Sequence, residues 1–342
     1  MIKYLPFSFQ KLSKEHLFIS FITSYLVIFN LLFIFQSSWI GELWLSLLPY
    51  FLVINIIFSV ILIIILVLQI FKFKPTKLYY KISTNFILGF IAVVSIFSNS
   101  LLTLKIYDYF YQKPDVEIQT ELQNGLKVGF FNILENNTNY NLVDNKLREL
   151  NLDVISFAEF DENHYQNIPF LKTYPHFFPN TVPKKNTTLT TIVSTIVIFS
   201  KLPFSEVGYK KLANNNALIA KINYNNQNYE IITNHLSNPI IPRYFETRNQ
   251  DILSLEYLVE AKKDSKVIVL GDFNTTPWSK YYPQFKDYNN VFKGRGVYIT
   301  WQVGPFALPI DYMFTSKNLD IINYKIDQQN GSDHHLIWAT VV

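Results

Sequence analysis

Residues 267–279 read Val-Ile-Val-Leu-Gly-Asp-Phe-Asn-Thr-Thr-Pro-Trp-Ser, and this stretch decides the fold of the part of the chain that contains it. Val267 to Leu270 form a short apolar run of the kind that builds a buried strand, and Gly271 ends it. Asp272 and Asn274 stand two positions apart, so an extended backbone points both side chains to one face. A carboxylate that can bind a metal or orient water thus lies beside an amide that can donate to a phosphate oxygen. For these four residues alone, an ordinary Asx turn after a strand is an equally good explanation.

The first third of the chain differs from the rest in its charge. Hydrophobic residues make up 49% of the sequence and charged residues 16%, whereas about 25% charged is typical of a soluble protein. Residues 1–105 hold eight lysines, no arginine and two glutamates, a net charge of +6, while the remainder carries −2. A dedicated nucleic-acid binder usually has a basic domain, so the near-neutral remainder argues mildly against a nuclease for long polymers. The absence of cysteine excludes disulfides, thiolate catalysis and cysteine-ligated zinc.

Three long apolar segments lie in residues 1–105, at about 17–36, 43–71 and 83–104. Each is long enough to cross the hydrocarbon core of a bilayer. No small-residue cleavage site follows the first segment, which indicates an uncleaved anchor and not a signal peptide. Three uncharged runs of this length also argue against a buried helical hairpin of a soluble protein. We predict a membrane anchor of three transmembrane helices in residues 1–105, then a polar linker at 106–124 and a separate domain at 125–342.

The lysines predict the orientation of the anchor. The N-terminus and the second loop are basic, and the second loop contains Lys72, Lys74, Lys77 and Lys81. Positively charged ends stay in the cytoplasm, and three crossings then place residues beyond 106 on the far side of the membrane. Asn274-Thr275-Thr276 is a glycosylation sequon, and a sugar on Asn274 would block the candidate site. We therefore predict an integral protein of a bacterial inner membrane with an extracytoplasmic domain.

From Leu126 onward the pattern is that of an α/β domain. Helices are predicted at 141–150 and 244–261, and strands at 127–134, 153–158, 191–199, 217–224, 229–233, 267–270, 309–314 and 335–342. Helices alternate with strands in places, but strands also follow strands directly. That mixture predicts two packed sheets with helices outside them, and not a regular parallel array.

Polar residues recur at the ends of these strands: Asn132, Glu159, His235, Asp272, Asn274, Asp311, Asp333 and His334. Each has a structural explanation when it is taken alone, such as a surface glutamate, a satisfied histidine or a plain turn at Asp333-His334. Asp311 is the exception, because it lies inside an apolar strand and a buried carboxylate needs a partner.

The set and its order resemble the endonuclease/exonuclease/phosphatase superfamily, which has the DNase I-like fold. The matching segments are Phe-Phe-Asn132, Asp153-Val-Ile-Ser-Phe-Ala-Glu159, Ile198-Phe-Ser-Lys-Leu-Pro203, Asn234-His235-Leu236, Arg248-Asn-Gln250, Gly271-Asp-Phe-Asn274, Ile310-Asp311-Tyr312 and Ser332-Asp333-His334. The resemblance covers about residues 125–342 and implies a four-layered α/β sandwich. The chain departs from the family pattern at Ala158, where glutamine is frequent, at Asn234, where threonine is usual, and at His335, near which a proline often follows.

The resemblance also implies a role for each residue. Glu159 would bind Mg²⁺ or Mn²⁺, with Asn132 and Asp333 close by, and oxygen ligands suit such hard ions. Asp272 would orient or deprotonate the attacking water. The phosphate would accept hydrogen bonds from Asn274 and His235, while His334 would stabilise or protonate it and Asp311 would hold the His334 ring.

The predicted function is therefore metal-dependent hydrolysis of a phosphodiester by a membrane-anchored enzyme. The substrate is left open between nucleic acid, a phospholipid headgroup as in sphingomyelinase-like members, and a small phosphoester, because a fold is weak evidence for a substrate. A catalytically inactive, membrane-tethered binding module of the same fold is the alternative. A transporter has little support, because the apolar segments lack the ionisable residues that mark ion and substrate paths. The predicted partners are the phosphodiester substrate and the lipid bilayer, and no protein partner is predicted.

Overall fold

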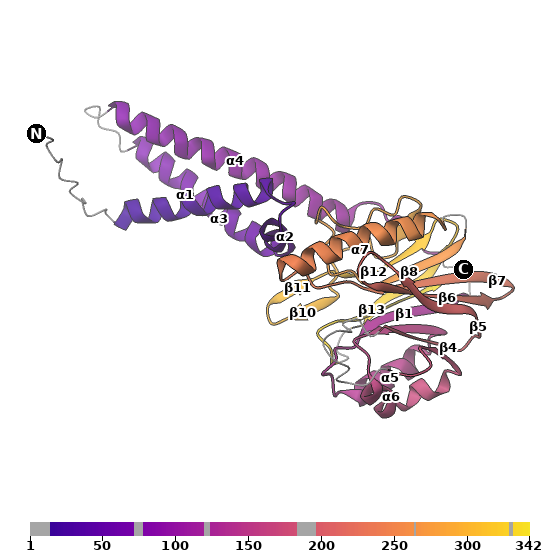
Figure 1. Cartoon of the computed structure of the whole chain (residues 1–342). Helices are drawn as coiled ribbons and strands as arrows, with labels where there is room; N and C mark the ends of the chain where they lie inside the picture. The colour runs from indigo at the N-terminus through magenta and orange to yellow at the C-terminus, as the bar shows by residue number, and fades with distance from the viewer. Residues whose placement is uncertain (1–13, 72–77, 120–123, 183–195, 263–264, 328–330) are drawn as a thin grey trace, which may run out of the picture. The chain divides into compact units, whose positions relative to one another are not determined.

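A computed structural model describes residues 14–71, 78–119, 124–182, 196–262, 265–327 and 331–342 (Figure 1). The chain forms two compact units, Met1–Lys105 and Ile106–Val342. The first unit is helical, with α1 (Lys14–Ile34), α2 (Trp39–Ser46), α3 (Leu48–Phe71) and most of α4 (Leu78–Tyr111). The second unit begins with the last turns of α4 and contains all the strands of the described residues.

Buried polar side chains join the helices of the first unit. Asn55 on α3 donates to Asn99 Oδ1 on α4 at 2.6 Å, and Asn30 on α1 donates to Ser95 Oγ on α4 at 3.1 Å. Hydrogen bonds of this kind hold helices together where the surroundings are as apolar as the side chains, because hydrophobic burial then gives little preference for association.

The structure corrects the prediction of three transmembrane helices to two candidates. Leu48–Leu68 on α3 and Phe86–Tyr111 on α4 are long and apolar enough to cross a membrane, with 21 and 26 residues. The apolar part of α1 is shorter, Leu17–Leu32. At 1.5 Å per residue it extends over about 24 Å, which is less than the roughly 30 Å of a hydrocarbon core. The second predicted span, 43–71, is also interrupted, because α2 ends at Ser46 and α3 starts at Leu48.

The second unit is built on two six-stranded sheets. Sheet A has the order β13 (Ile321–Asp327), β14 (Leu336–Val341), β1 (Leu126–Asn132), β2 (Val154–Ala158), β4 (Val197–Ser200) and β3 (His176–Phe178). Sheet B has the order β5 (Phe204–Lys211), β6 (Asn216–Tyr224), β7 (Gln227–His235), β8 (Lys266–Asp272), β12 (Asp311–Ser316) and β9 (Tyr288–Asn290). A separate hairpin pairs β10 (Trp301–Val303) with β11 (Phe306–Leu308).

Helices cover the outer faces of both sheets. In Figure 1, α7 (Pro242–Glu260) lies over sheet B, while α5 (Tyr140–Leu150) and α6 (Glu162–Asn167) lie beyond sheet A, with a short 3₁₀ turn at Pro169–Thr173. The prediction of two packed sheets flanked by helices is confirmed. Residues 183–195, which include most of the strand predicted at 191–199, lie outside the described residues. The sequence interpretation missed the short or edge strands β3, β5, β9 and β13 and the β10–β11 hairpin.

The segment predicted as a linker, 106–124, is partly built into the second unit. Its first residues continue α4 to Tyr111, and Tyr109, Phe110 and Val116 are buried. The backbone carbonyls of Tyr109 and Phe110 accept hydrogen bonds from the amides of Gly294 and Gly296. The polar residues of this segment led to the prediction of a linker, but its apolar side chains Tyr109, Phe110 and Val116 are buried in the α/β unit.

Two apolar layers hold the second unit together. The layer between the sheets includes Phe130 of β1, Leu270 of β8 and Met313 of β12. The layer between sheet A and its helices includes Phe131 of β1 and Leu147 of α5. Since successive side chains of a strand point to opposite faces, neighbouring phenylalanines of β1 serve the two layers. Strand β1 is therefore buried on both sides.

Gly271 is required by a close approach between β7 and β8. A Cβ atom added at Gly271 would lie 2.2 Å from the backbone oxygen of Asn234, and φ at Gly271 is +156°. We expect Gly271→Ala to lower the free energy of unfolding by about 1–3 kcal/mol, the range for an overpacked core. Chemical denaturation measures it, with Gly208→Ala as the control, because a Cβ at Gly208 meets nothing within 4 Å. Equal stability of the two variants would contradict this account.

Candidate active site

Six of the predicted site residues come together where strands of both sheets end. Parallel pairing aligns the ends of β1 and β2, with Asn132 beside Ala158, and the ends of β7 and β8, with His235 beside Asp272. The antiparallel strand β12 starts at the same edge, with Asp311 beside Asp272. The residues brought together are Asn132, Glu159, His235, Asp272, Asp311 and His334.

The alternation of the strands aims four of these side chains into the space between the sheets. Asn132, Asp272 and Asp311 each stand two positions from a residue of the apolar layer between the sheets, namely Phe130, Leu270 and Met313. His235 stands four positions after Ile231 of that same layer. Residues an even number of positions apart on a strand share a face, so the site is the polar end of the layer that packs the two sheets.

Glu159 joins this group through an unusual backbone. Ala158 faces the layer between the sheets, so a regular strand would turn Glu159 toward the outer helices. Instead φ is +57° at Glu159, in the left-handed region, and the side chain meets Asn132. Asn274 is also left-handed, with φ +48°. Non-glycine residues in this region cost about 1–3 kcal/mol each and gather at functional sites.

Asn132 bridges two carboxylates at the centre of the site. Its Nδ2 donates to Glu159 Oε1 at 3.1 Å and to Asp272 Oδ2 at 3.2 Å, and it lies 3.5 Å from His334 Nε2. The second oxygen of Glu159 accepts from the Glu135 amide at 3.2 Å. Two carboxylates from different sheets thus converge on one donor, which marks a place where positive charge is favourable.

His334 is held as a cation by the carboxylates around it. Its Nδ1 donates to Asp311 Oδ2 at 3.0 Å, and its Nε2 lies 3.7 Å from Asp272 Oδ2. Burial lowers the pKa of His334, but Asp311 and Asp272 outweigh burial and raise it to about 10. Asp311 is fully buried, and the amides of Ile310 and Asp311 both donate to Thr300 Oγ1 at 2.9 Å, which fixes the start of β12.

Asp272 carries a carboxyl group of reduced acidity. Burial, with the charge of Asp311 in addition, raises the pKa of Asp272 to about 6, although His334 and His235 act in the opposite direction. The amide of Asn274 donates to Asp272 Oδ1 at 2.9 Å and orients the group. A base with such a pKa is suited to accept a proton near neutral pH.

Glu159 remains the more acidic and more accessible carboxylate. Its side chain is 32% exposed, against 2% for Asp272. Burial acts to raise the pKa of Glu159, but His235, Asn132 and the Glu135 amide together hold it below its usual value. The two carboxyl groups are therefore differentiated, with Glu159 ionised and open and Asp272 buried and more basic.

His235 faces both of these carboxylates. Its Nε2 lies 3.8 Å from Glu159 Oε1 and 3.7 Å from Asp272 Oδ2. Its Nδ1 is buried without a hydrogen-bond partner among the described residues. The side chain of Asn274, which was predicted to donate to the phosphate, donates from Nδ2 to the Leu236 backbone carbonyl at 2.9 Å. One of the two amide hydrogens of Asn274 is then left for a ligand.

Comparison with known proteins agrees with this geometry. The model of the Endonuclease/Exonuclease/phosphatase family matches residues 129–334, more than half of the chain. The chain belongs to this family. A comparison with curated protein sequences finds no match.

Solved structures of the family share the fold at low sequence identity. The D. rerio TDP2 complexed with single-strand DNA product is 16% identical, with a TM-score of 0.53, and the match covers 64% of this chain and 100% of that one. The human Nocturnin catalytic domain with bound sulfate is 18% identical, with a TM-score of 0.51, over 65% and 95%. An endonuclease/exonuclease/phosphatase from Bacteroides vulgatus is 16% identical, with a TM-score of 0.51, over 64% and 99%.

Two groups of side chains in this family member have the chemistry of a cation site. Asp272, Asp311 and His334 offer ligand atoms that all lie within 4.8 Å of one another. However, His334 is protonated and already donates to Asp311, so its nitrogens are poor ligands. Glu159 and Asp272 present carboxylate oxygens, which Mg²⁺ prefers, whereas Asn132 turns its Nδ2 to these carboxylates and its Oδ1 accepts from the Leu134 amide. The donor chemistry therefore fits a hard divalent ion on the Glu159 side.

Asp333 lies at the border of the site. Its Oδ2 accepts from Trp301 Nε1 at 2.9 Å, and its Oδ1 accepts from Ser332 Oγ at 3.4 Å. Ser332 Oγ also donates to the Asn132 carbonyl at 2.8 Å, which ties the loop to β1. These contacts direct the Asp333 carboxylate to Trp301, and its predicted part as a metal ligand beside Glu159 stays a prediction.

Two further residues support the site, although the sequence interpretation gave neither of them a role. Arg248 on α7 is fully buried, and its Nη1 donates to the Asn274 carbonyl at 2.7 Å. Tyr312 donates through its hydroxyl to the Thr275 carbonyl at 2.8 Å. Both residues fix the loop that follows Asp272. The sequence signal for Arg248 was its place on the apolar stripe of α7, at helical spacing from Phe245, Ile252, Leu255 and Val259.

Proposed function

We propose that the chain is a membrane-anchored phosphodiester hydrolase that depends on a divalent metal and works by in-line attack of water. The observation that carries the proposal is the convergence of Glu159, Asp272 and the Asp311–His334 pair at one edge of the packed sheets. The cationic imidazole would stabilise negative charge that develops on a phosphate. The two carboxyl groups differ in acidity, so that one can bind a metal while the other accepts a proton.

Each residue has a role that its contacts support. Glu159 would hold Mg²⁺ or Mn²⁺. Asn132 and Asp333 stay candidate ligands, and Asn132 would have to turn its Oδ1 from the Leu134 amide to the ion. The ion supplies Lewis-acid polarisation of a phosphoryl oxygen when it is bound. Asp272 orients the attacking water and takes its proton, since its buried carboxyl is the more basic one.

The remaining groups stabilise the phosphate. His235 Nε2, which faces the Glu159 and Asp272 carboxylates, would donate to a phosphoryl oxygen, and so would the second amide hydrogen of Asn274. His334 donates from Nε2, because its Nδ1 is committed to Asp311. Asp311 does not touch the phosphate in this scheme. It is a positioning residue that keeps the His334 ring oriented and charged.

The substrate class is a phosphodiester, either in nucleic acid or in a phospholipid headgroup. The TDP2 neighbour with single-strand DNA product supports the former by analogy of fold. The net charge of −2 beyond residue 105 and the apolar helices support a lipid or a small phosphoester. Activity of the full chain with Mg²⁺ on single-strand DNA and on sphingomyelin, measured side by side, separates these substrates.

For location, we propose that α3 and α4 cross a bacterial inner membrane and that the catalytic unit lies outside the cytoplasm. The lysines between α3 and α4, Lys72, Lys74 and Lys77, with Lys81 in α4, keep that end inside, so a single crossing by α4 exports the domain. With two crossings the basic N-terminus lies on the same side as the catalytic unit, so this orientation depends on the lysines between α3 and α4 alone.

The absence of cysteine allows a direct test of this topology. We introduce Lys210→Cys, on the exposed part of β5, as the only cysteine of the chain. A membrane-impermeant maleimide added to intact cells should label this cysteine, whereas Lys74→Cys, in the loop between α3 and α4, should react only after lysis. Labelling of Lys74→Cys alone in intact cells would reverse the proposed orientation.

Metal dependence is the central test of the proposed chemistry. Excess chelator should abolish hydrolysis of bis(p-nitrophenyl) phosphate, and Mg²⁺ or Mn²⁺ should restore it. Glu159→Gln removes the charge of the ligand, so the metal concentration for half-maximal rate should rise at least about tenfold. The matched control is Glu149→Gln on the exposed side of α5. Undiminished hydrolysis in excess chelator would remove the metal from the mechanism.

The His334–Asp311 pair should behave as one unit. His334→Ala should lower turnover by about 10²–10³, the usual loss of a preorganised donor. Asp311→Asn should also be severe, and the double variant should be little worse than His334→Ala, because groups that act together are not additive. If the loss of turnover in the double variant equals the product of the two single losses, Asp311 does not act through His334.

A titration separates this role from a merely structural one. In metal-free protein, Asp311→Asn should lower the pKa of His334 from its raised value of about 10, because a carboxylate that stabilises the imidazolium is gone. Histidine NMR signals followed against pH measure this shift, with the exposed Asp320→Asn as the control. A structural carboxylate would lower the melting temperature and leave the His334 titration unchanged.

A further inference from the structure

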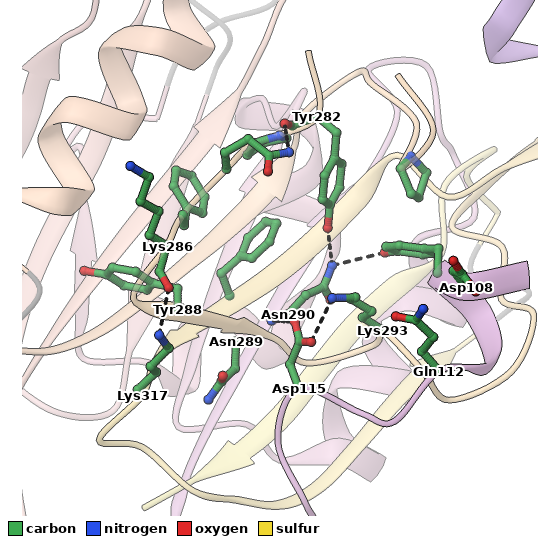
Figure 2. A pocket seen from close by; sticks show the side chains of 16 residues that line it. Asp108, Gln112, Asp115, Tyr282, Lys286, Tyr288, Asn289, Asn290, Lys293 and Lys317 are labelled. Atoms are coloured by element: carbon green, nitrogen blue, oxygen red, sulfur yellow. Dashed lines mark hydrogen bonds and ion pairs between the residues drawn. The ribbon is translucent and has the colours of Figure 1, made fainter. Parts of the chain in front are cut away.

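A cavity of about 510 Å³ lies in the α/β unit, and none of its lining residues belongs to the candidate active site (Figure 2). Its walls come from the end of α4, with Asp108 and Gln112, and from the segment 282–290. Lys286, Lys293 and Lys317 line it from three separate segments. Aromatic side chains that pack on one another line it as well: Tyr282, Phe285, Tyr288 and Phe314.

This cavity is separate from the catalytic groups. Strand β12 links the two places, since Asp311 is its first residue and Lys317 directly follows its last residue, Ser316. Six residues of extended chain cover about 20 Å. Phe314 and Pro277 line the cavity closer to the site, but a ligand at Lys317 would not touch the reacting phosphate. The lysine end of the cavity therefore needs an explanation of its own.

Lys286, Lys293 and Lys317 outnumber the two lining carboxylates, Asp108 and Asp115, which gives the cavity a preference for anions. Lys293 pairs with Asp115 at 2.9 Å. Lys317 donates to the Lys286 carbonyl at 2.8 Å and lies 3.4 Å from Asp287. The ammonium of Lys286 has no hydrogen-bond partner in the part of the chain that the structure describes, and Figure 2 shows Lys286 and Lys317 at the same side of the cavity. Two cations with at most weak ion pairs therefore share one side of the cavity.

The position along α4 indicates where the ligand comes from. The uncharged part of the candidate span on α4 ends at Leu104, before Lys105, and the span itself ends at Tyr111. Asp108 and Gln112 stand three and seven residues beyond Lys105, which is roughly 5 and 10 Å along a helical path. The headgroup layer begins at the end of the hydrocarbon core and is about 5–7 Å thick on each side. If α4 crosses the membrane as proposed, Gln112, which follows the span directly, would lie at the level of the phospholipid headgroups.

Two exposed tyrosines support this level. Tyr107 and Tyr111 are 56% and 55% exposed and stack on each other at 5.1 Å. Neither is needed in the core, and tyrosine is enriched where a membrane helix passes through the headgroup region.

We propose that this cavity binds the phosphate of an anionic phospholipid headgroup through Lys286 and Lys317 and thereby seats the catalytic unit on the membrane surface. The proposal rests on the proposed crossing of the membrane by α4. It assigns the lipid to an accessory site, whatever the substrate of the catalytic centre is. Juxtamembrane lysines are attracted to anionic lipid, and a shaped cavity adds selectivity for a headgroup that enters it.

Lipid binding to the full-length chain in detergent tests the proposal. Native mass spectrometry with added short-chain phosphatidylglycerol gives the dissociation constant, and phosphatidylcholine is the zwitterionic comparison. Lys286→Glu with Lys317→Glu should weaken phosphatidylglycerol binding at least about tenfold. The milder Lys286→Gln with Lys317→Gln should weaken it in the same direction. The matched control is Lys172→Glu with Lys210→Glu, both exposed, with Lys210 on the edge strand of sheet B opposite to β9.

The control experiments separate the possible failures. Equal weakening in the control variant would reduce the effect to net charge and overturn the site. Release of phosphatidylglycerol by millimolar inorganic phosphate would make free phosphate the ligand and overturn the lipid assignment. Extraction of the chain from membranes by alkaline carbonate would refute the anchoring on which the proposal rests. The cavity variants should hydrolyse bis(p-nitrophenyl) phosphate at the wild-type rate, and a loss would assign the cavity to the catalytic machinery instead.

Discussion

The structure of the α/β unit depends on the apolar layer between its two sheets. Strands β1, β7, β8 and β12 each place alternate side chains in that layer, and the same alternation carries on to a polar residue at the strand end. A shift of register by one residue in β8 would turn Leu270 and Asp272 away together. Packing and chemistry are therefore not independent here, because the contacts that hold the sheets together also aim the carboxylates at each other across them.

That arrangement has an electrostatic consequence. Asp272 and Asp311 are neighbours on paired strands and both are buried, so their charges repel in a medium that screens poorly. The cationic His334 compensates for the charge of one carboxylate, Asp311, and the bridging Asn132 amide compensates partly for the charge of Asp272. A negative excess remains on the side of Glu159, which is also the accessible side. In the proposed function, a divalent cation and then a phosphate would complete the balance of charge.

Particular residues show how much the sequence alone could predict. Strands with continuous apolar runs, such as Val267 to Leu270, were found because burial on both faces leaves a clear pattern, and their polar ends gave most of the site. The edge strand β9 was missed because Tyr288–Asn290 is three residues long and two of the three are asparagines. The partnership of Trp301 with Asp333 spans 32 positions and has no local signal. Arg248 did have one, since a charge on the apolar stripe of α7 requires a buried acceptor.

The boundary between the two units has a physical cause that composition obscured. Up to Leu104, α4 is apolar and many of its large side chains are exposed, such as Phe90, Val93 and Phe97, which suits a lipid environment. Beyond Lys105 the helix instead buries Tyr109 and Phe110 against aromatic residues of the α/β unit, including Tyr298 and Trp278. Asn290 donates to the hydroxyls of both Tyr109 and Tyr282, so the last turn of α4 shares hydrogen bonds with strand β9. One helix therefore has two surroundings, and the change of its exposed side chains from apolar to polar, not the end of the helix, is where the first unit stops and the second begins.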